Sequence, residues 1–245
     1  KSKNKRQMII LYRIYQFCIM LPLMLVATVI AAIITITACA LGGGRWWGYW
    51  PAHIWGRIFC WLTLVRVTVK GRENVDPATS YVFVANHQGA YDIFSIYGFL
   101  NHNFRWMMKA ALRKIPLVGF ACEMSKQIYV DKSSPSALRH TMARAERLLS
   151  DGMSIVVFPE GARTWDGKMR PFRRGAFMLA REFSLPVVPI TIDGAFSVMP
   201  RFKKLPHWGH ITLTIHKPIM PPAEGHDTTM LAAEAQEAIA SVLPH

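Results

Sequence analysis

The pattern of hydrophobic and polar positions predicts two similar strands, each of which ends in a polar loop. Residues 82–85 are all apolar, which is typical of a strand buried on both faces of a parallel sheet, and polar residues beginning with Asn86 follow at once. Residues 154–158 form a second strand, apolar after Ser154, which stops at Pro159. Because open α/β sheets bind ligands at the carboxyl ends of their strands, we expect the two loops to border one cleft.

The first loop carries a histidine and an aspartate at a spacing that suits proton transfer. His87 and Asp92 flank a turn into a helix, which the apolar spacing of residues 93–100 predicts. A histidine accepts a proton near neutral pH, and a carboxylate on its other ring nitrogen fixes the tautomer. The alternative is that Asp92 only caps the helix and His87 is an ordinary loop residue; spacing alone favours this, because such pairs arise often by chance. The matching end of the second strand shifts the balance toward a shared site.

The second loop supplies charged groups of both signs. It contains Glu160, Gly161 and Arg163. The guanidinium fork of Arg163 suits a phosphate or a carboxylate, and the alternative is an ordinary surface ion pair with Glu160. We therefore expect a cleft with His87 and Asp92 on one wall and with Glu160 and Arg163 on the other.

Patterns in the rest of the chain complete an α/β fold, with a mixed, largely parallel sheet flanked by helices. Pro189 argues against a central position for its strand unless it lies at a bulge. Lys109 is either an anchor for a phosphate or part of a solvated basic face, with equal weight on each. Strands are predicted at residues 66–71, 128–130, 185–192 and 211–215, a strand leading into a helix at 104–114, and helices at 134–151, 175–183 and 228–243, the last with Asp227 as its N-cap.

The N-terminal part of the chain predicts a helical hairpin embedded in a membrane. Residues 14–44 carry no charge, and a helix of this length is roughly 46 Å long, well beyond the ~20 residues that cross a bilayer. Three glycines then break the helix, and an aromatic belt follows at the expected headgroup level. Residues 52–65 form a shorter and less apolar stretch that returns or lies along the surface. We therefore predict a membrane-anchoring hairpin at 1–65 and an α/β domain at 66–245.

Composition favours a membrane surface over nucleic acid. The net charge is +14, from 29 Lys and Arg against 15 Asp and Glu, and 51% of the residues are hydrophobic. A basic chain favours anionic partners, and one this apolar favours phospholipid. The basic N-terminal residues are expected in the cytoplasm; the α/β domain shares that side if the hairpin returns, and lies on the other side if it does not. The four cysteines indicate neither a disulfide framework nor a zinc site.

Several motifs resemble those of the glycerolipid acyltransferase superfamily. Residues 86–92 (Asn-His-Gln-Gly-Ala-Tyr-Asp) resemble its His-x4-Asp block, and residues 158–163 (Phe-Pro-Glu-Gly-Ala-Arg) resemble its Phe-Pro-Glu-Gly-Thr-Arg block. The order and spacing match from about residue 67 to residue 218, and the chain is most similar to the lysophosphatidic acid acyltransferases. It departs from the pattern at Ala162, where a threonine is usual; whether Thr164 replaces that hydroxyl is open.

The resemblance implies transfer of a fatty acyl group from a thioester, acyl-CoA or acyl-carrier protein, to the sn-2 hydroxyl of lysophosphatidic acid. His87 is then the general base, and Asp92 holds and polarises it. Arg163 and Lys109 bind the acceptor phosphate, while Glu160 hydrogen-bonds the glycerol backbone. The substrate-binding residues so implied are Lys109, Glu160, Gly161 and Arg163. No metal and no bound cofactor are implied, and the cytosolic donors used by the family favour a catalytic domain on the cytoplasmic face.

Two alternatives keep part of this prediction. One retains the chemistry and changes the acceptor to glycerol 3-phosphate or to a different lysolipid, because motifs shared across the superfamily do not select the acceptor. The other is a basic, membrane-anchored protein that binds anionic lipid or nucleic acid without catalysis. It explains the charge and the hairpin, but not two polar motifs at the ends of buried strands.

Overall fold

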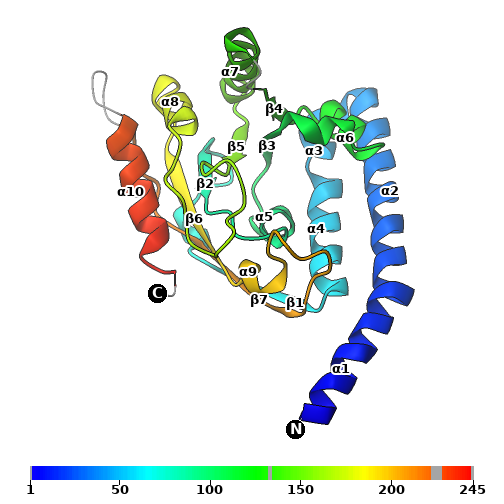
Figure 1. Cartoon of the computed structure of the whole chain (residues 1–245). Coiled ribbons are helices and arrows are strands. Elements are labelled where there is room, and N and C mark those ends of the chain that lie inside the picture. Colours follow the sequence, from blue (N-terminus) through cyan, green and yellow to red (C-terminus); the bar gives the residue numbers. More distant parts are fainter. Residues whose placement is uncertain (1, 132–133, 222–227, 244–245) are drawn as a thin grey trace.

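The centre of the molecule is a seven-stranded sheet in the order β1-β7-β6-β2-β5-β3-β4 (Figure 1). A computed structural model describes residues 2–131, 134–221 and 228–243 of the chain. Neighbouring strands pair in parallel except β6 and β7, which are antiparallel, so the predicted mixed, largely parallel sheet is confirmed. The strands are β1 (Val65–Lys70), β2 (Val82–Ala85), β3 (Phe104–Lys109), β4 (Ile128–Val130), β5 (Ser154–Val157), β6 (Val187–Asp193) and β7 (Gly209–Ile215).

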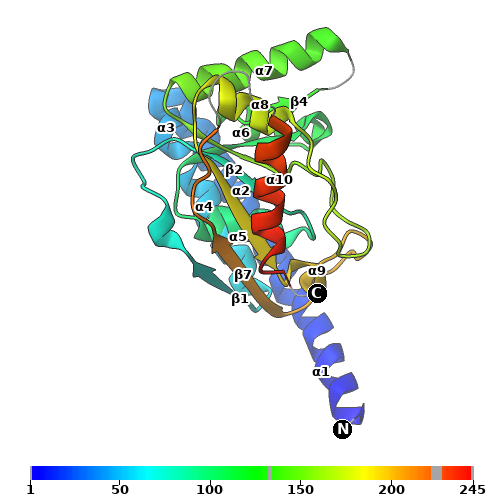
Figure 2. The ribbon, with the colours of Figure 1, turned by 90° about the vertical axis from the view of Figure 1, so that its left-hand side faces the viewer.

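Helices flank the sheet on both faces, as the α/β prediction requires. They are α1 (Ser2–Tyr15), α2 (Leu21–Ala38), α3 (Gly44–Trp47), α4 (Trp50–Leu62), α5 (Tyr91–Phe99), α6 (Val118–Met124), α7 (Pro135–Ser150), α8 (Gly175–Glu182), α9 (Ala195–Val198) and α10 (Thr228–Ala240). Helices α4 and α5 cover one face, whereas α7, α8 and α10 lie on the other (Figures 1 and 2). The predicted strand leading into a helix is β3 followed by a 3₁₀ turn, Ala110–Lys114. Asp227, the predicted N-cap of α10, lies outside the described residues.

The strand that carries the first polar loop is buried on both sides. Val82 and Val84 point into the core under α7, α8 and α10, while Phe83 and Ala85 point into the core under α4 and α5. All four side chains are fully buried, because successive residues of a strand face opposite sides of a sheet and both sides are covered here. The uninterrupted apolar run is the sequence signature of this position.

Pro189 lies in β6, a strand with neighbours on both sides. The sequence argues against such a position unless the proline lies at a bulge, and the pairing of β6 is irregular at Pro189. Regular antiparallel pairing with β7 begins only at Ile190, and Val187 instead forms an isolated bridge with Ile219. Between these points the chain opposite β6 is irregular, and Pro189 takes part only through its carbonyl, which accepts from His216 N at 3.0 Å. The missing N–H of proline therefore breaks no regular ladder.

The N-terminal segment forms the predicted helical hairpin. Helices α1 and α2 continue each other through a π-helical segment, Gln16–Met20, and the run breaks at Gly42, whose φ is 92°. Helix α4 then returns beside α2 (Figure 1). Hydrogen bonds join the two arms: Trp55 Nε1 donates to Thr28 Oγ1 at 2.9 Å, and the Tyr12 hydroxyl donates to the carbonyl of Thr63 at 2.9 Å.

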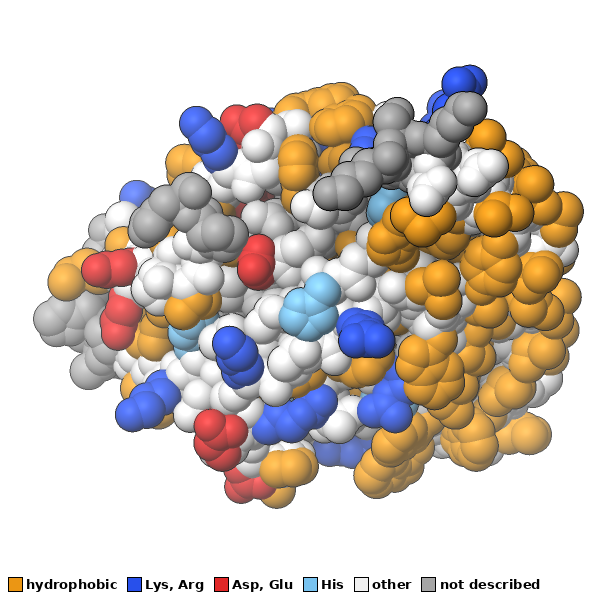
Figure 3. Space-filling view, turned by 90° about the horizontal axis from the view of Figure 1, so that it is seen from below, with side chains coloured by type: hydrophobic (Ala, Val, Ile, Leu, Met, Phe, Trp, Pro, Cys, Tyr) orange, Lys and Arg blue, Asp and Glu red, His pale blue; other side chains and the backbone are white. Residues whose placement is uncertain are grey.

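The outer surface of this hairpin is strongly apolar. The helical run Arg6–Trp47 is long and apolar enough to cross a membrane. Large side chains along it face outward, including Leu25 at 66% exposed and Leu41 at 88% exposed. Figure 3 shows hydrophobic side chains gathered on the side of the molecule where α2 lies, with Lys and Arg spread over the rest of that view. These features fit a membrane anchor, while embedding itself stays a prediction.

The tip of the hairpin is fastened to the sheet by a buried arginine. Arg105, in β3, is 1% exposed, and its guanidinium donates to the carbonyl oxygens of Gly44 and Phe104, each at 2.8 Å. Helix α4 also packs along α5. The division of the chain at residue 65 therefore stays a prediction, because the hairpin and the α/β domain share a packed interface.

Candidate active site

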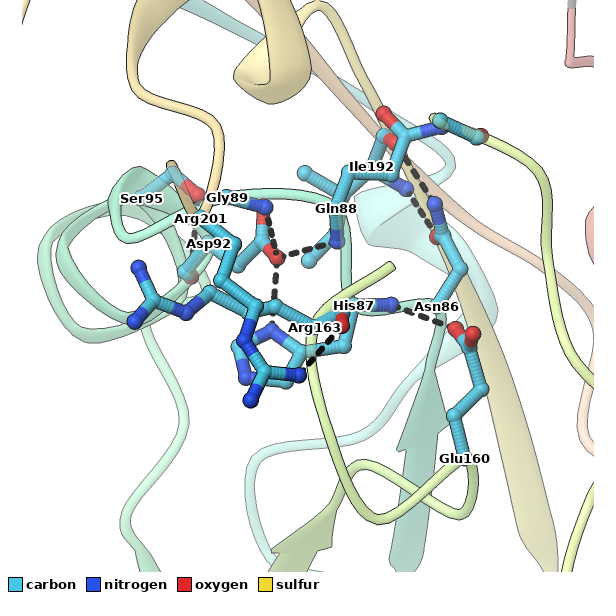
Figure 4. Close-up of polar contacts among 11 residues, drawn as sticks. Asn86, His87, Gln88, Gly89, Asp92, Ser95, Glu160, Arg163, Ile192 and Arg201 are labelled. Carbon is cyan, nitrogen blue, oxygen red and sulfur yellow. Dashed lines mark hydrogen bonds and ion pairs between the residues drawn. The ribbon is translucent and has the colours of Figure 1, made fainter. Parts of the chain in front are cut away.

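The carboxyl ends of β2, β5 and β3 meet at one edge of the sheet, and the two polar loops leave from there. Asn86, directly after β2, is fully buried and fixes its loop to β6: its side chain donates to the carbonyl of Ile192 and accepts from the N–H of Ile192, each at 2.8 Å. Next along the loop, His87 turns its ring toward the first turn of α5 (Figure 4). The backbone that precedes His87 is thus fixed at the edge of the sheet.

His87 and Asp92 form the predicted pair. His87 Nδ1 lies 2.7 Å from Asp92 Oδ2, and the same oxygen accepts the backbone N–H groups of Gln88 at 2.7 Å and Gly89 at 2.9 Å. Asp92 is fully buried, whereas 14% of the His87 side chain is exposed. Since Asp92 holds both the loop and the ring, the alternative of a mere helix cap is wrong. With Nδ1–H donated to the carboxylate, His87 Nε2 keeps a lone pair for a proton.

An aromatic stack supports the imidazole from one side. The rings of His87 and Phe158 lie 3.9 Å apart between centroids and are parallel within 4°. Trp106, on β3, continues the stack against Phe158 at 5.0 Å. Neither ring is marked as part of the site by the local sequence pattern. One face of the base is therefore covered, and the ring has little freedom to rotate away from Asp92.

Glu160 fixes the backbone on two sides of the site. It is 4% exposed, and its two oxygens accept the backbone N–H groups of His87 at 2.7 Å and Arg170 at 2.9 Å. Burial raises the pKa of Glu160, and these two hydrogen bonds act in the opposite direction. Its ion pair with Arg163, the alternative raised from sequence, is not among the ion pairs of the described residues. The predicted contact with glycerol stays a prediction.

Gly161 lets the second loop turn back toward His87. Its φ of 78° is in the left-handed region that favours glycine, and its N–H donates to the carbonyl of Phe158 at 3.0 Å. Further along, the N–H of Thr164 donates to the carbonyl of His87 at 3.0 Å. The Thr164 hydroxyl donates to Asp166 Oδ1 at 2.7 Å and is buried, so it does not stand in for the hydroxyl absent at Ala162.

Arg163 reaches this site, and Lys109 lies further along the same edge. Arg163 is half-buried, and its side chain lies on the side of the His87–Asp92 pair away from Glu160 (Figure 4). Lys109 ends β3, which β5 separates from β2, and is exposed. Neither cation has an ion-pair partner within the part of the chain that the structure describes. In that same part, no three His, Cys, Asp or Glu side chains come together in a way that could hold a metal ion.

Comparison with known proteins places this arrangement in a family. A family model described as Acyltransferase matches residues 66–193, more than half of the chain. The chain belongs to the acyltransferase family. The match begins at β1 and ends with β6, so it contains the His87 loop and the Glu160 loop.

Relatives within the family share one named activity. The 1-acyl-sn-glycerol-3-phosphate acyltransferase of Chlamydomonas reinhardtii is 34% identical over 181 residues, which cover 73% of this chain and 53% of that protein. The human 1-acyl-sn-glycerol-3-phosphate acyltransferase alpha is 34% identical over 130 residues, covering 53% of this chain and 46% of the relative. The chain thus spans about half the length of these curated relatives.

A solved structure matches over a larger share. The crystal structure of the 1-acyl-sn-glycerophosphate (LPA) acyltransferase PlsC from Thermotoga maritima is 26% identical, with a TM-score of 0.71. The match covers 89% of this chain and 93% of that one, so it includes part of the N-terminal hairpin as well as the sheet.

Proposed function

We propose that this protein transfers a fatty acyl group from an acyl thioester to the sn-2 hydroxyl of lysophosphatidic acid, which gives phosphatidic acid. The observation that carries the proposal is the 2.7 Å bond between His87 Nδ1 and Asp92 Oδ2, on a sheet edge that also bears Arg163. The activity in the names of the relatives supports this acceptor.

His87 moves the proton in the proposed reaction. Its Nε2 takes the proton of the acceptor hydroxyl as that oxygen attacks the thioester carbonyl. The tetrahedral intermediate then collapses, the carbon–sulfur bond breaks, and the imidazolium returns its proton to the departing thiolate. Asp92 stabilises the imidazolium while it exists. The step needs no metal and no bound cofactor, because the thioester is already activated and serves as a substrate.

The remaining predicted residues hold the acceptor. Arg163 and Lys109 bind the phosphate through charge-assisted hydrogen bonds. Gly161 gives the second loop the turn that brings Arg163 to His87. Glu160 chiefly fixes the backbone of His87, and a contact with the glycerol backbone would use the lone pairs that remain on its oxygens.

The hairpin, in this proposal, holds the catalytic domain on the cytoplasmic face of an anionic membrane. The exposed apolar side chains of α1 and α2 enter the lipid, and the surplus of positive charge faces the headgroups. The acceptor then arrives from the bilayer, and acyl-CoA or acyl-carrier protein arrives from the cytoplasm. Nucleic acid is not a partner.

Product identification tests the proposal. The full chain, reconstituted in vesicles, is incubated with radiolabelled acyl-CoA or acyl-carrier protein and with lysophosphatidic acid, and labelled phosphatidic acid is expected. Glycerol 3-phosphate and lysophosphatidylglycerol serve as the alternative acceptors. Label found mainly in the product of another acceptor would correct the substrate. Transfer to none of them would leave a protein that only binds lipid.

A further inference from the structure

A third loop, from a distant part of the sequence, is joined to the His87 loop. It follows β6 and α9, and Pro200 in it forms an isolated bridge with Gly89. The N–H of Ala90 also donates to the carbonyl of Met199 at 3.1 Å. The approach is so close that a Cβ at Gly89 would lie 2.5 Å from the carbonyl oxygen of Ala195, which explains the glycine. The residue after Pro200 is therefore held at a fixed place beside the catalytic pair.

That residue is Arg201, and its side chain is directed to the site. Its Nη1 lies 3.5 Å from the carbonyl oxygen of Arg163, a long contact, and its guanidinium carbon lies 4.4 Å from the ring centroid of Trp165. Figure 4 shows Arg201 and Arg163 together, next to His87 and Asp92. Since the N–H of Thr164 donates to the carbonyl of His87, the chain directly after Arg163 is bonded to the loop that carries the general base.

Among the described residues, neither guanidinium group has a carboxylate partner. The ion pairs of the described residues are His87–Asp92 and those that Glu123 makes with Arg113 and Arg144. Two acidic residues lie three positions from Arg163 in sequence. Glu160 accepts the backbone N–H groups of His87 and Arg170, and Asp166 uses Oδ1 for the Thr164 hydroxyl and the N–H of Lys168. A guanidinium carries five N–H donors, and Arg201 uses at most one of them for the carbonyl of Arg163. Two neighbouring cations with open donors are a site for a multiply charged anion.

We propose that Arg201, paired with Arg163, binds the phosphate of the acceptor and selects phosphomonoester lysolipids over phosphodiester ones. The inference rests on the proposed function. A phosphomonoester carries about −1.5 to −2 charge at neutral pH, whereas a phosphodiester carries a single charge. A second guanidinium therefore strengthens the binding of the phosphomonoester more than that of the phosphodiester. Trp165 acts as a positioning residue, since its ring holds the Arg201 guanidinium.

Acceptor kinetics in vesicles test this assignment. Arg201→Gln is expected to raise KM for lysophosphatidic acid about 10- to 100-fold, as for the loss of a charge-assisted hydrogen bond, with kcat and the KM for the acyl donor nearly unchanged. The preference for lysophosphatidic acid over lysophosphatidylglycerol should fall with it. Lys203→Gln is the matched control, because it removes the same charge two residues away from an exposed position and should leave both values unchanged.

Further variants separate positioning from folding. Trp165→Ala should raise the same KM by less than Arg201→Gln does, and Trp165→Phe, which keeps an aromatic ring, should restore it. Cosedimentation with phosphatidylglycerol vesicles should be equal for all variants. The assignment would be overturned by an unchanged KM in Arg201→Gln or by an equal rise of KM in Lys203→Gln. It would also be overturned if activity fell equally on both acceptors, or if a loss of vesicle binding accounted for the rise in KM.

Failure of the proposed function gives a different result. In that case the unsubstituted protein transfers no acyl group to any acceptor, and binding is measured directly by titrating lysophosphatidic acid in detergent. Weaker binding by Arg201→Gln than by Lys203→Gln would then support the phosphate site without the reaction. Transfer to lysophosphatidic acid with an unaltered KM in Arg201→Gln would support the reaction and remove the site.

Discussion

The two edges of the sheet each carry a histidine bonded to a side-chain oxygen, and only one of them is arranged for chemistry. At the carboxyl edge, His87 Nδ1 lies 2.7 Å from Asp92 Oδ2. At the amino edge of the same parallel strands, His102 Nε2 lies 2.8 Å from Ser154 Oγ. The two hydrogen bonds are nearly equal in length, so length alone does not distinguish a catalytic histidine from a structural one.

The partner and the surroundings make the difference. His102 is 6% exposed and packs against the rings of Tyr81 and Phe83, and burial lowers its pKa to about 4. Its partner is a neutral hydroxyl, which also accepts the N–H of Tyr81. It therefore stays uncharged. His87 instead faces a carboxylate that can stabilise a positive ring, at an edge where long loops bring in cations. A histidine is a candidate base where its protonated form has a counter-charge and its free nitrogen has access.

The largest effect is expected when the two histidines are removed in turn. His87→Ala should lower kcat by up to about 10⁴-fold, because the hydroxyl of the acceptor loses its base. His102→Gln should keep turnover per folded molecule near that of the unsubstituted protein. Both are measured as phosphatidic acid formed per mole of vesicle-bound protein. If His87→Ala were active, or if the two variants lost the same share of turnover, the two edges would not differ in their role.

A smaller loss is expected when the counter-charge alone is removed. In Asp92→Asn the amide oxygen can take the place of Oδ2, where the ring N–H and the N–H groups of Gln88 and Gly89 hold it. The geometry is then retained and the negative charge is lost, so kcat should fall about 10²-fold with little change in KM. Circular dichroism checks the fold, and full activity in this variant would mean that the carboxylate only positions the ring.

A still smaller change is expected at the stacked ring. Phe158→Leu removes the parallel contact at 3.9 Å, and a stacked pair of this kind is worth about 0.5–1.5 kcal/mol, so kcat should fall about 2- to 10-fold. KM for both substrates should change little, since the ring supports the base. Phe158→Tyr keeps the stack and should recover most of the rate. A rise in KM without a change in kcat would instead make Phe158 part of a substrate pocket.

Local patterns were sufficient to predict the elements and the core of the site. The apolar run at 82–85 followed by Asn86 marks the end of a buried strand, and the position of His87 and Asp92 around the next turn follows from the short distance along the chain. The glycines at 42–44 likewise predict the hairpin, because a left-handed residue ends a helix wherever the remainder of the fold lies.

Contacts between distant segments could not be predicted in this way. Arg201 lies beside His87 because β6 pairs with β2. A local sequence pattern does not predict the order of the strands in the sheet. For the same reason no local pattern gives Arg201 a role at the site, and the family resemblance implies a substrate contact for Glu160 where the structure gives it two backbone partners. Arg105 is a third case: a charge in a strand suggests exposure, yet it is buried against the tip of the hairpin.

The smallest effect on turnover is expected from the protonation of His102 at the amino edge, which should instead change the stability of the fold. In the unfolded chain a histidine has a pKa of 6.5, whereas folded His102 has a pKa of about 4. Below the higher value the unfolded chain binds a proton that the folded one does not, so stability falls as the pH drops from about 6.5 toward about 4. Between about pH 7.5 and about pH 5 this amounts to about 2 kcal/mol of unfolding free energy.

His102→Gln removes this titration while a hydrogen bond to Ser154 stays within reach. Its unfolding free energy, measured with denaturant in detergent micelles, should therefore decline less on acidification than that of the unsubstituted protein, by about 2 kcal/mol. His140→Gln is the matched control: His140 is exposed on α7, so its variant should keep the full decline. The same decline in His102→Gln would mean that the amino-edge histidine can be charged without cost, and burial would no longer separate it from His87.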